Sequence, residues 1–232
     1  GKRIQTLPSQ TIADTVINHF NDRLFHDRDE RNLIKSGRVW YGEKFDITTE
    51  YTFNFSFPDI DLTSDVFLET YVAARSFYNS SFTVISEGNQ MTPFIEKVVD
   101  YKDADYAKKS IDRISFLPSD DNVEVFIRYN KPTSGSLGWL NYIEINAVRQ
   151  LKFSGNQMSF RNIHSVGNAK VSEFILENAN TSVTVWDVTE TINARKVETE
   201  SVGSSLRFSL PTDSLREFIA FNAESFYNVG FV

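Results

Sequence analysis

The chain has 232 residues, enough for one large domain or two smaller ones, since domains mostly run ~50 to 200 residues. Its 24 basic and 31 acidic residues give a net charge of −7, which argues against nucleic acid or an anionic membrane surface as a partner. The sequence contains no cysteine, so it supplies no disulfide, thiolate ligand or thiol nucleophile. No apolar run approaches the ~18 to 20 residues of a membrane-spanning helix.

The first part of the chain is polar. Residues 2–36 are punctuated by charged residues, and the segment 27–32 is too charged to be buried, which predicts a solvated loop or sheet edge. Between Gly37 and Asp46, glycines bracket the aromatic pair at 40–41. This pattern predicts a strand end or a turn.

The clearest strand is Tyr51–Phe57, where aromatic residues alternate strictly with polar ones. A helix would scatter those rings around its circumference. Pro58 and Asp59 end the pattern. The segment 123–129 alternates in the same way, with Glu124 and Arg128 on its polar face, so one face of the sheet is expected to be buried and the other solvated.

Further strands are expected at short spacings, with no helical pattern between them. They are 67–74, 81–86, 94–99, 111–117, 123–130 and 140–147. Aromatic residues make up 14% of the chain, and such residues fit pleated, half-buried surfaces. We therefore predict an all-β fold, with an antiparallel, jelly-roll-like β-sandwich over residues 1–153.

A soft boundary is expected at 152–157, where small polar residues separate two apolar segments. Residues 154–232 are expected to form a smaller immunoglobulin-like β-sandwich. Its strands are predicted at 171–176, 183–188, 195–199, 205–210 and 218–222. Alternatively, some of these strands complete the first sheet. Helix is expected only as short turns at 104–110 and 213–217.

Residues that could carry chemistry are few. The histidines are His19, His26 and His164, and no two have the three-to-five-residue spacing of a helical zinc site, so each is interpreted as a lone surface or edge histidine. The segment Gly135–Gly138 lacks the spacing and the strand-to-helix context of a nucleophile elbow. We assign no catalytic, cofactor-binding, metal-binding or ligand-binding residue, and we predict no cofactor.

Two acidic clusters have the composition of loops that gather oxygen ligands for calcium. One contains Asp59, Asp61 and Asp65, and the other contains Asp100, Asp103 and Asp105. Neither has the central glycine and final glutamate of the twelve-residue calcium loop. Solvated turns, in which Asp side chains accept hydrogen bonds from nearby backbone amides, are the favoured interpretation.

Aromatic side chains in loops raise the possibility of carbohydrate binding. The candidates in or near predicted loops are Trp40, Tyr41, Tyr101, Tyr106 and Trp139. Trp40 and Trp139 adjoin apolar strand patterns and are expected to pack in the core or at its rim. Tyr101 and Tyr106 lie among Asp and Lys residues and are expected to be exposed.

Several stretches resemble a known family. The two most informative are 183–189, with the sequence VTVWDVT, and 206–221, with the sequence LRFSLPTDSLREFIAF. The segments 36–45, 139–151 and 156–162 extend the likeness in the same order. Together they resemble the region before the catalytic domain in gingipain-type cysteine peptidases that serve as sortases of the bacterial type IX secretion system, the PorU family.

The resemblance implies a cell-surface, outer-membrane-associated peptidase that removes the C-terminal sorting domain from cargo and joins the cargo to a lipopolysaccharide anchor. The family's catalytic Cys and His match no position here, so the catalytic domain is expected beyond Val232. The chain would then be the non-catalytic N-terminal region. It is expected to pack on the downstream catalytic domain and to position cargo or secretion-system partners.

An alternative hypothesis is a free-standing cell-surface β-sandwich that binds carbohydrate or acts as an adhesin. It predicts that substitution of Trp40 or Tyr101 abolishes glycan binding without unfolding the chain. The aromatic end of the chain is expected to continue or to dock rather than fray in water. It contains Phe226, Tyr227, Phe231 and Val232.

Overall fold

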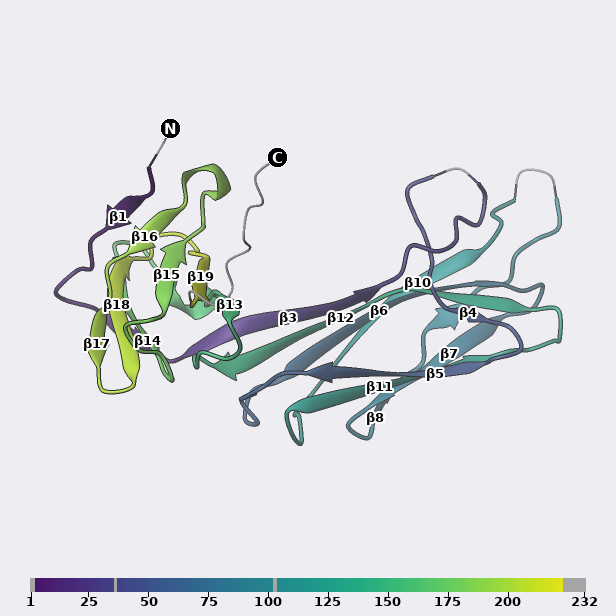
Figure 1. Cartoon of the computed structure of the whole chain (residues 1–232). Helices are drawn as coiled ribbons and strands as arrows, with labels where there is room; N and C mark the ends of the chain where they lie inside the picture. The colour runs from purple at the N-terminus through teal and green to yellow at the C-terminus, as the bar shows by residue number, and fades with distance from the viewer. Residues whose placement is uncertain (1–2, 36, 102–103, 223–232) are drawn as a thin grey trace, which may run out of the picture. The chain divides into compact units, whose positions relative to one another are not determined.

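The computed structural model describes residues 3–35, 37–101 and 104–222, and the aromatic C-terminal segment named above lies outside them. Within these residues the chain forms strands throughout, with two short 3-10 helices, η1 (Ile163–Ser165) and η2 (Thr191–Asn193) (Figure 1). The predicted all-β sandwich class is confirmed. None of the described helices is long and apolar enough to cross a membrane.

The chain divides into two compact units. The large unit is Arg23–Ala147, and the split unit combines Gly1–Asp22 with Val148–Val232. This division differs from the expected domains 1–153 and 154–232, because the N-terminal strands pair with strands near the C-terminus. The jelly-roll and immunoglobulin-like assignments remain predictions.

Two sheets form the large unit. One has the order β10-β6-β12-β3 with β4 beside β12, and the other has the order β5-β11-β7-β8 with β9 beside β7. The strands β3 and β12 run on into the split unit. The bounds are β3 (His19–Asp27), β4 (Lys44–Phe45), β5 (Glu50–Ser56), β6 (Val66–Arg75), β7 (Ser80–Ser86), β8 (Asn89–Met91), β9 (Phe94–Ile95), β10 (Lys108–Phe116), β11 (Asn122–Asn130) and β12 (Leu137–Gln150).

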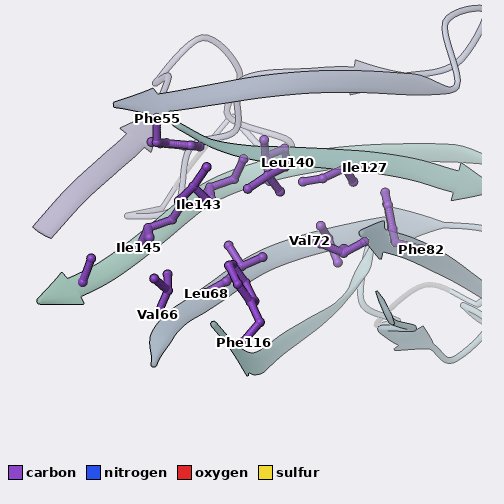
Figure 2. Packing of buried hydrophobic residues seen from close by; sticks show 14 of the residues in the cluster. Phe55, Val66, Leu68, Val72, Phe82, Phe116, Ile127, Leu140, Ile143 and Ile145 are labelled. Atoms are coloured by element: carbon purple, nitrogen blue, oxygen red, sulfur yellow. The ribbon is translucent and has the colours of Figure 1, made fainter. Parts of the chain in front are cut away.

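The core of the large unit lies between these sheets. Alternate residues of each strand point inward, as the period of two requires, and Figure 2 shows apolar side chains from β6 and β12 meeting those from β7 and β11. Phe82, Ile127 and Leu140 are completely buried. Each such side chain contributes about 1.5–3 kcal/mol through removal of apolar surface from water.

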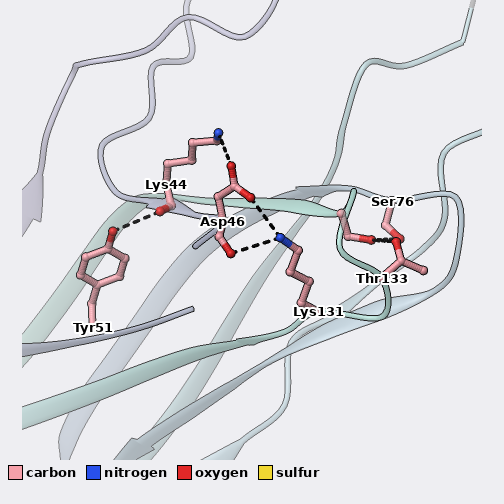
Figure 3. Close-up of polar contacts among 7 residues, drawn as sticks. Lys44, Asp46, Tyr51, Ser76, Lys131 and Thr133 are labelled. Atoms are coloured by element: carbon pink, nitrogen blue, oxygen red, sulfur yellow. Dashed lines mark hydrogen bonds and ion pairs between the residues drawn. The ribbon is translucent and has the colours of Figure 1, made fainter. Parts of the chain in front are cut away.

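A group of hydrogen bonds and ion pairs around Asp46 connects three segments of the large unit (Figure 3). The Asp46 carboxylate accepts from Lys44 Nζ at 2.7 Å and from Lys131 Nζ at 3.0 Å. These hydrogen bonds lower the pKa of the Asp46 carboxyl group below its usual value. Tyr51 Oη donates to the Lys44 backbone oxygen at 3.1 Å, so the β4 strand is tied to both β5 and the loop after β11.

The split unit also contains two sheets, with the orders β1-β16-β15-β19-β13 and β17-β18-β14-β2. A stack of phenylalanine rings fills its core, and the Phe174 and Phe208 rings lie 5.2 Å apart. The bounds are β1 (Gln5–Leu7), β2 (Thr15–Ile17), β13 (Gln157–Phe160), β14 (Val171–Leu176), β15 (Thr184–Asp187), β16 (Arg195–Val197), β17 (Glu200–Val202), β18 (Ser205–Pro211) and β19 (Phe218–Phe221).

Several local expectations are wrong. Residues 104–110 form no helix, because β10 begins at Lys108 and pairs with β6. The strand expected at 94–99 ends at Ile95. Residues 214–217 form no helix, and Asp213 Oδ1 instead accepts from the Ala169 backbone N at 2.7 Å. The expectation for 27–32, by contrast, is confirmed: β3 ends at Asp27 on the edge of its sheet, and residues 28–31 are exposed.

Candidate functional site: the outer face of the large unit

The face of the β10-β6-β12-β3 sheet that points away from the core is aromatic and charged. Tyr71 and Ala73 of β6 reach it by simple alternation, since their neighbours Val72 and Ala74 point into the core. In β12 the register shifts between Leu140 and Tyr142, so Asn141 is an extra residue. We call this surface the outer face.

The bulge decides which side chains share the outer face. Trp139 pairs with Ala73 and Tyr142 pairs with Tyr71, although three residues separate Trp139 from Tyr142 in sequence. In an unbroken strand that odd spacing would place the two rings on opposite faces. Asn141 therefore brings both rings into one aromatic cluster with Tyr41 and Tyr71.

One row across the outer face is aromatic and apolar. Ile111, Tyr71 and Tyr142 are neighbours in register across three strands. The Tyr71 and Tyr142 ring centres lie 5.6 Å apart, edge to face, and Phe25 of β3 extends the row at 5.1 Å from Tyr142. Such ring pairs contribute about 0.5–1.5 kcal/mol beyond area burial.

The next row is charged. Glu69 and Glu144 stand opposite each other on β6 and β12, an unfavourable arrangement for two carboxylates. Each is paired on its outer side: Arg113 Nε donates to Glu69, and Arg23 Nη2 donates to Glu144 at 2.7 Å. The order across the row is therefore Arg113, Glu69, Glu144 and Arg23, and the net charge of the row is zero.

Tyr142 connects the two rows. Its hydroxyl donates to the second Glu69 oxygen. Burial and then the hydrogen bond to this carboxylate raise the pKa of Tyr142 to about 12. Burial and a hydrogen bond with Tyr71 also raise the pKa of Tyr41. Both phenols are held protonated, as hydrogen-bonding and packing groups.

A hairpin loop, described at residues 28–35 and 37–43, lies over one end of the outer face. Arg31 and Tyr41 form a backbone bridge, and the Asn141 Nδ2 of the bulge donates to the Trp40 backbone oxygen at 2.6 Å. Gly42 is required where the loop returns, because a Cβ there would lie 2.7 Å from the Arg28 Cβ. The loop covers Trp139, which is 3% exposed.

A cavity of about 230 Å³ opens between this loop and the segment before β10. We call it the loop cavity. Apolar groups form most of its wall, and Arg38 and Asp105 bring charge to it. Its lining residues are Leu33, Ile34, Gly37, Arg38, Val39, Tyr41, Asp105, Tyr106 and Ala107.

The aromatic residues singled out from the sequence differ in their exposure and in their contacts. Tyr101 and Tyr106 are exposed as predicted, at 66% and 39%, and the packing of Trp139 is confirmed. Trp40 is 42% exposed, more than expected, because the hairpin loop carries it away from the strand. The Tyr106 ring has the Arg75 guanidinium 4.4 Å from its centre and Trp139 at 6.4 Å, so it is engaged within the protein.

The histidines do not come together as a metal site. His26 Nε2 lies 3.0 Å from Glu43 Oε1, and its ring packs 4.7 Å from Phe53. His19 Nδ1 lies 2.8 Å from Asn18 Oδ1, and His164 sits in η1. Among residues 3–35, 37–101 and 104–222, no group of three His, Cys, Asp or Glu residues could hold a metal ion.

The first acidic cluster contains a turn organised by Asp61. Asp61 accepts from the Thr63 backbone N at 3.0 Å and from Ser64 Oγ at 2.6 Å, which confirms the turn interpretation for that residue. Asp105 pairs with Lys108 at 2.6 Å. Asp103 lies outside the described residues. Ser136 is buried and bonded to Ser76 Oγ at 3.0 Å, so it is not presented as a nucleophile.

No protein-family model and no curated protein matches the sequence. Among solved structures, the chain is similar to dimeric latent PorU from Porphyromonas gingivalis, with a TM-score of 0.81 at 15% identity. The match covers 96% of this chain and 22% of that chain. At this identity the likeness shows the fold: both units together have a PorU-like β-sandwich architecture.

Other solved structures match only weakly. A CBM36 domain of a xylanase from the hindgut metagenome of Trinervitermes trinervoides gives a TM-score of 0.32 at 7% identity, over 53% of this chain and 96% of that chain. A Cry1Da tryptic core variant from Bacillus thuringiensis gives 0.29 at 14% identity, over 42% and 17%. Likenesses this slight bear on neither fold nor function.

Proposed function

We propose that the chain is the non-catalytic N-terminal β-sandwich region of a cell-surface, sortase-like cysteine peptidase of the type IX secretion system. In this role it packs on the catalytic domain of the same protein and positions cargo or partner proteins. Its place would be at the outer membrane, on the cell surface. The chemistry of the peptidase would belong to the catalytic domain.

The observation that carries the proposal is the likeness to PorU along 96% of the chain. A coincidental sandwich would be expected to match over one unit, whereas a match over 96% of the chain includes residues of both. The sequence resemblance supports the same family through independent features. Its two most informative stretches, 183–189 and 206–221, form neighbouring parts of the split unit.

The proposal is tested on the parent protein. Deletion of residues 1–232 should abolish removal of the sorting domain from secreted cargo, and the isolated 232-residue chain should bind the separately expressed catalytic domain. Unchanged cargo processing together with no measurable binding would contradict the proposal. A reading frame that stops after Val232 would do so as well.

The carbohydrate-binding alternative has one observation in its favour, the exposure of Trp40 and Tyr101. Stacking against a sugar needs a free ring face. The engagement of Tyr106 by Arg75 removes one of the rings on which that alternative relied. It therefore remains the second candidate, tested by glycan titration of Trp40→Ala.

A further inference from the structure

We propose that the loop cavity of the large unit receives one apolar side chain from an acidic peptide segment of a partner protein. This inference deepens the proposed function, on which it rests, by naming the surface and the chemistry through which partners are positioned. It uses residues of the large unit alone.

The size of the cavity sets the kind of occupant. Sites for whole small molecules usually measure ~300–1,000 Å³, and the loop cavity, at about 230 Å³, is smaller. It suits a single side chain, such as a leucine or phenylalanine. Apolar anchors of this type, inserted into a pocket on the partner, carry most of the energy in many protein interfaces.

The wall of the cavity favours an apolar group. Leu33 and Ala107 line it and pack against the aromatic cluster of the outer face. Ile34 and Val39 stand at the rim and are 63% and 42% exposed. Covering these two side chains would remove apolar surface from water, which favours association.

The charge at the cavity favours an acidic segment. Asp105 is already paired with Lys108, at 2.6 Å. Within the described part of the chain, Arg38 has no carboxylate partner within ion-pair distance. In a chain of net charge −7, Arg38 therefore offers an unpaired positive charge at the cavity. Complementary charge would set the orientation and speed of binding.

The loop is built to keep the cavity open. The Arg31–Tyr41 bridge and the Asn141 hydrogen bond fix its base, and Asn32 Nδ2 donates to the Gly37 and Val39 backbone oxygens at 3.3 and 3.4 Å. A site that is already formed loses less conformational entropy on binding than one that must be ordered.

Fluorescence anisotropy with three labelled pentapeptides tests the proposal on the 232-residue chain. The peptides are Glu-Asp-Phe-Asp-Glu, Glu-Asp-Ala-Asp-Glu and Lys-Lys-Phe-Lys-Lys, each with blocked ends. The first should bind saturably, and replacement of its Phe by Ala should weaken binding about 30-fold or more, the loss expected for an anchor residue. The lysine peptide should bind at least about tenfold more weakly than the first.

The variant Arg38→Glu should weaken binding of the first peptide about tenfold and reduce its dependence on salt. Lys196→Glu makes the same charge change on an exposed residue of β16 that does not line the cavity, and should leave binding unchanged. Ala107→Leu, which adds volume to the wall, should reduce binding while circular dichroism shows the chain still folded.

Equal affinity for all three peptides, no binding of any, or an Arg38→Glu variant that binds normally would each overturn the inference. Displacement of the Phe peptide by cellohexaose would also overturn it and would assign the cavity to sugar. Because the titrations use the chain alone, they can fail while the deletion experiment on the parent protein succeeds, so the two proposals are separately testable.

Discussion

Arg216 Nη1 donates to Asp187 Oδ2 at 2.6 Å, and Asp187 is 1% exposed. This ion pair joins the two stretches on which the family resemblance most depends, since one residue belongs to 183–189 and the other to 206–221. Asp187 Oδ1 also accepts from the Thr189 backbone N at 3.0 Å, and Arg216 Nε donates to the Pro211 backbone oxygen at 2.6 Å. The pair thus organises the local backbone of the split unit.

Asp187→Ala should destabilise the split unit by about 3–5 kcal/mol, because it leaves a partly buried guanidinium without its carboxylate. Glu217→Ala is the matched control: it removes the Arg161–Glu217 pair, whose side chains are 41% and 47% exposed, and should cost about 0–1 kcal/mol. Urea denaturation followed by fluorescence measures both. Equal losses for the two variants would show that burial does not govern this pair.

Gly138→Ala should destabilise the large unit by about 1–3 kcal/mol through overpacking. A Cβ at this position would lie 2.9 Å from Phe82 Cζ and 3.1 Å from the Tyr129 ring, both in the core. Gly135→Ala adds the same methyl group where no atom lies within 4 Å, and should be close to neutral. Thermal unfolding of the two variants measures the difference between their stability losses. Equal losses would show that Phe82 shifts to accommodate the added methyl group.

Asn141→Ala should destabilise the large unit by about 1–3 kcal/mol, because the Trp40 carbonyl loses its donor next to a buried ring. The hairpin loop should then open more often, with faster amide hydrogen exchange at Gly42. Asn122→Ala, at an exposed strand end, serves as the control. Protection at Gly42 that matches the unsubstituted chain would indicate that the loop is held by its apolar packing alone.

Alkaline pH should destabilise the large unit through Tyr142. Its pKa is raised from 10.0 to about 12 on folding, so the unfolded chain loses this proton first as pH rises. The stability linked to Tyr142 is therefore complete below pH 10 and is lost between pH 10 and about 12. In Glu69→Gln the pKa should fall towards its usual value but stay above it, because burial remains.

Ultraviolet absorbance titration measures the ionisation of tyrosine hydroxyl groups. Subtracting the titration curve of Tyr142→Phe from that of the unsubstituted chain isolates the ionisation of Tyr142. The same difference taken in the Glu69→Gln background isolates the contribution of the carboxylate. An ionisation midpoint of Tyr142 that does not move in that background would rule out Glu69 as a cause of the shift.

Local alternation made some strands predictable. The predicted strand at 171–176 matches β14 in both bounds, and Tyr51–Phe57 matches β5 within one residue. In β3, by contrast, the apolar residues are separated by charged and polar ones on both faces, so tertiary pairing with β12 decides its structure. The strands β1 and β2 are three residues long and pair in parallel with distant segments, a pairing that no local pattern encodes.

The outer face was less predictable than the core. Sequence alternation assigns Trp139 and Tyr142 to opposite faces, and only the bulge at Asn141 reverses that assignment. The engagement of Tyr106 depends on Arg75, which is distant in sequence. The aromatic residues could therefore be singled out from the sequence, but their grouping depends on contacts between strands.

The large unit is an insertion. The chain leaves the split unit at Asp22 and returns to it at Val148, so no single cut separates the two units intact. Expression of residues 154–232 alone would omit β1 and β2 and leave open edges on β16 and β14, which invites aggregation. In evolution, the large unit could be replaced by another β-sandwich through a single exchange of the segment between Asp22 and Val148. The strand pairing within the split unit would then stay unchanged.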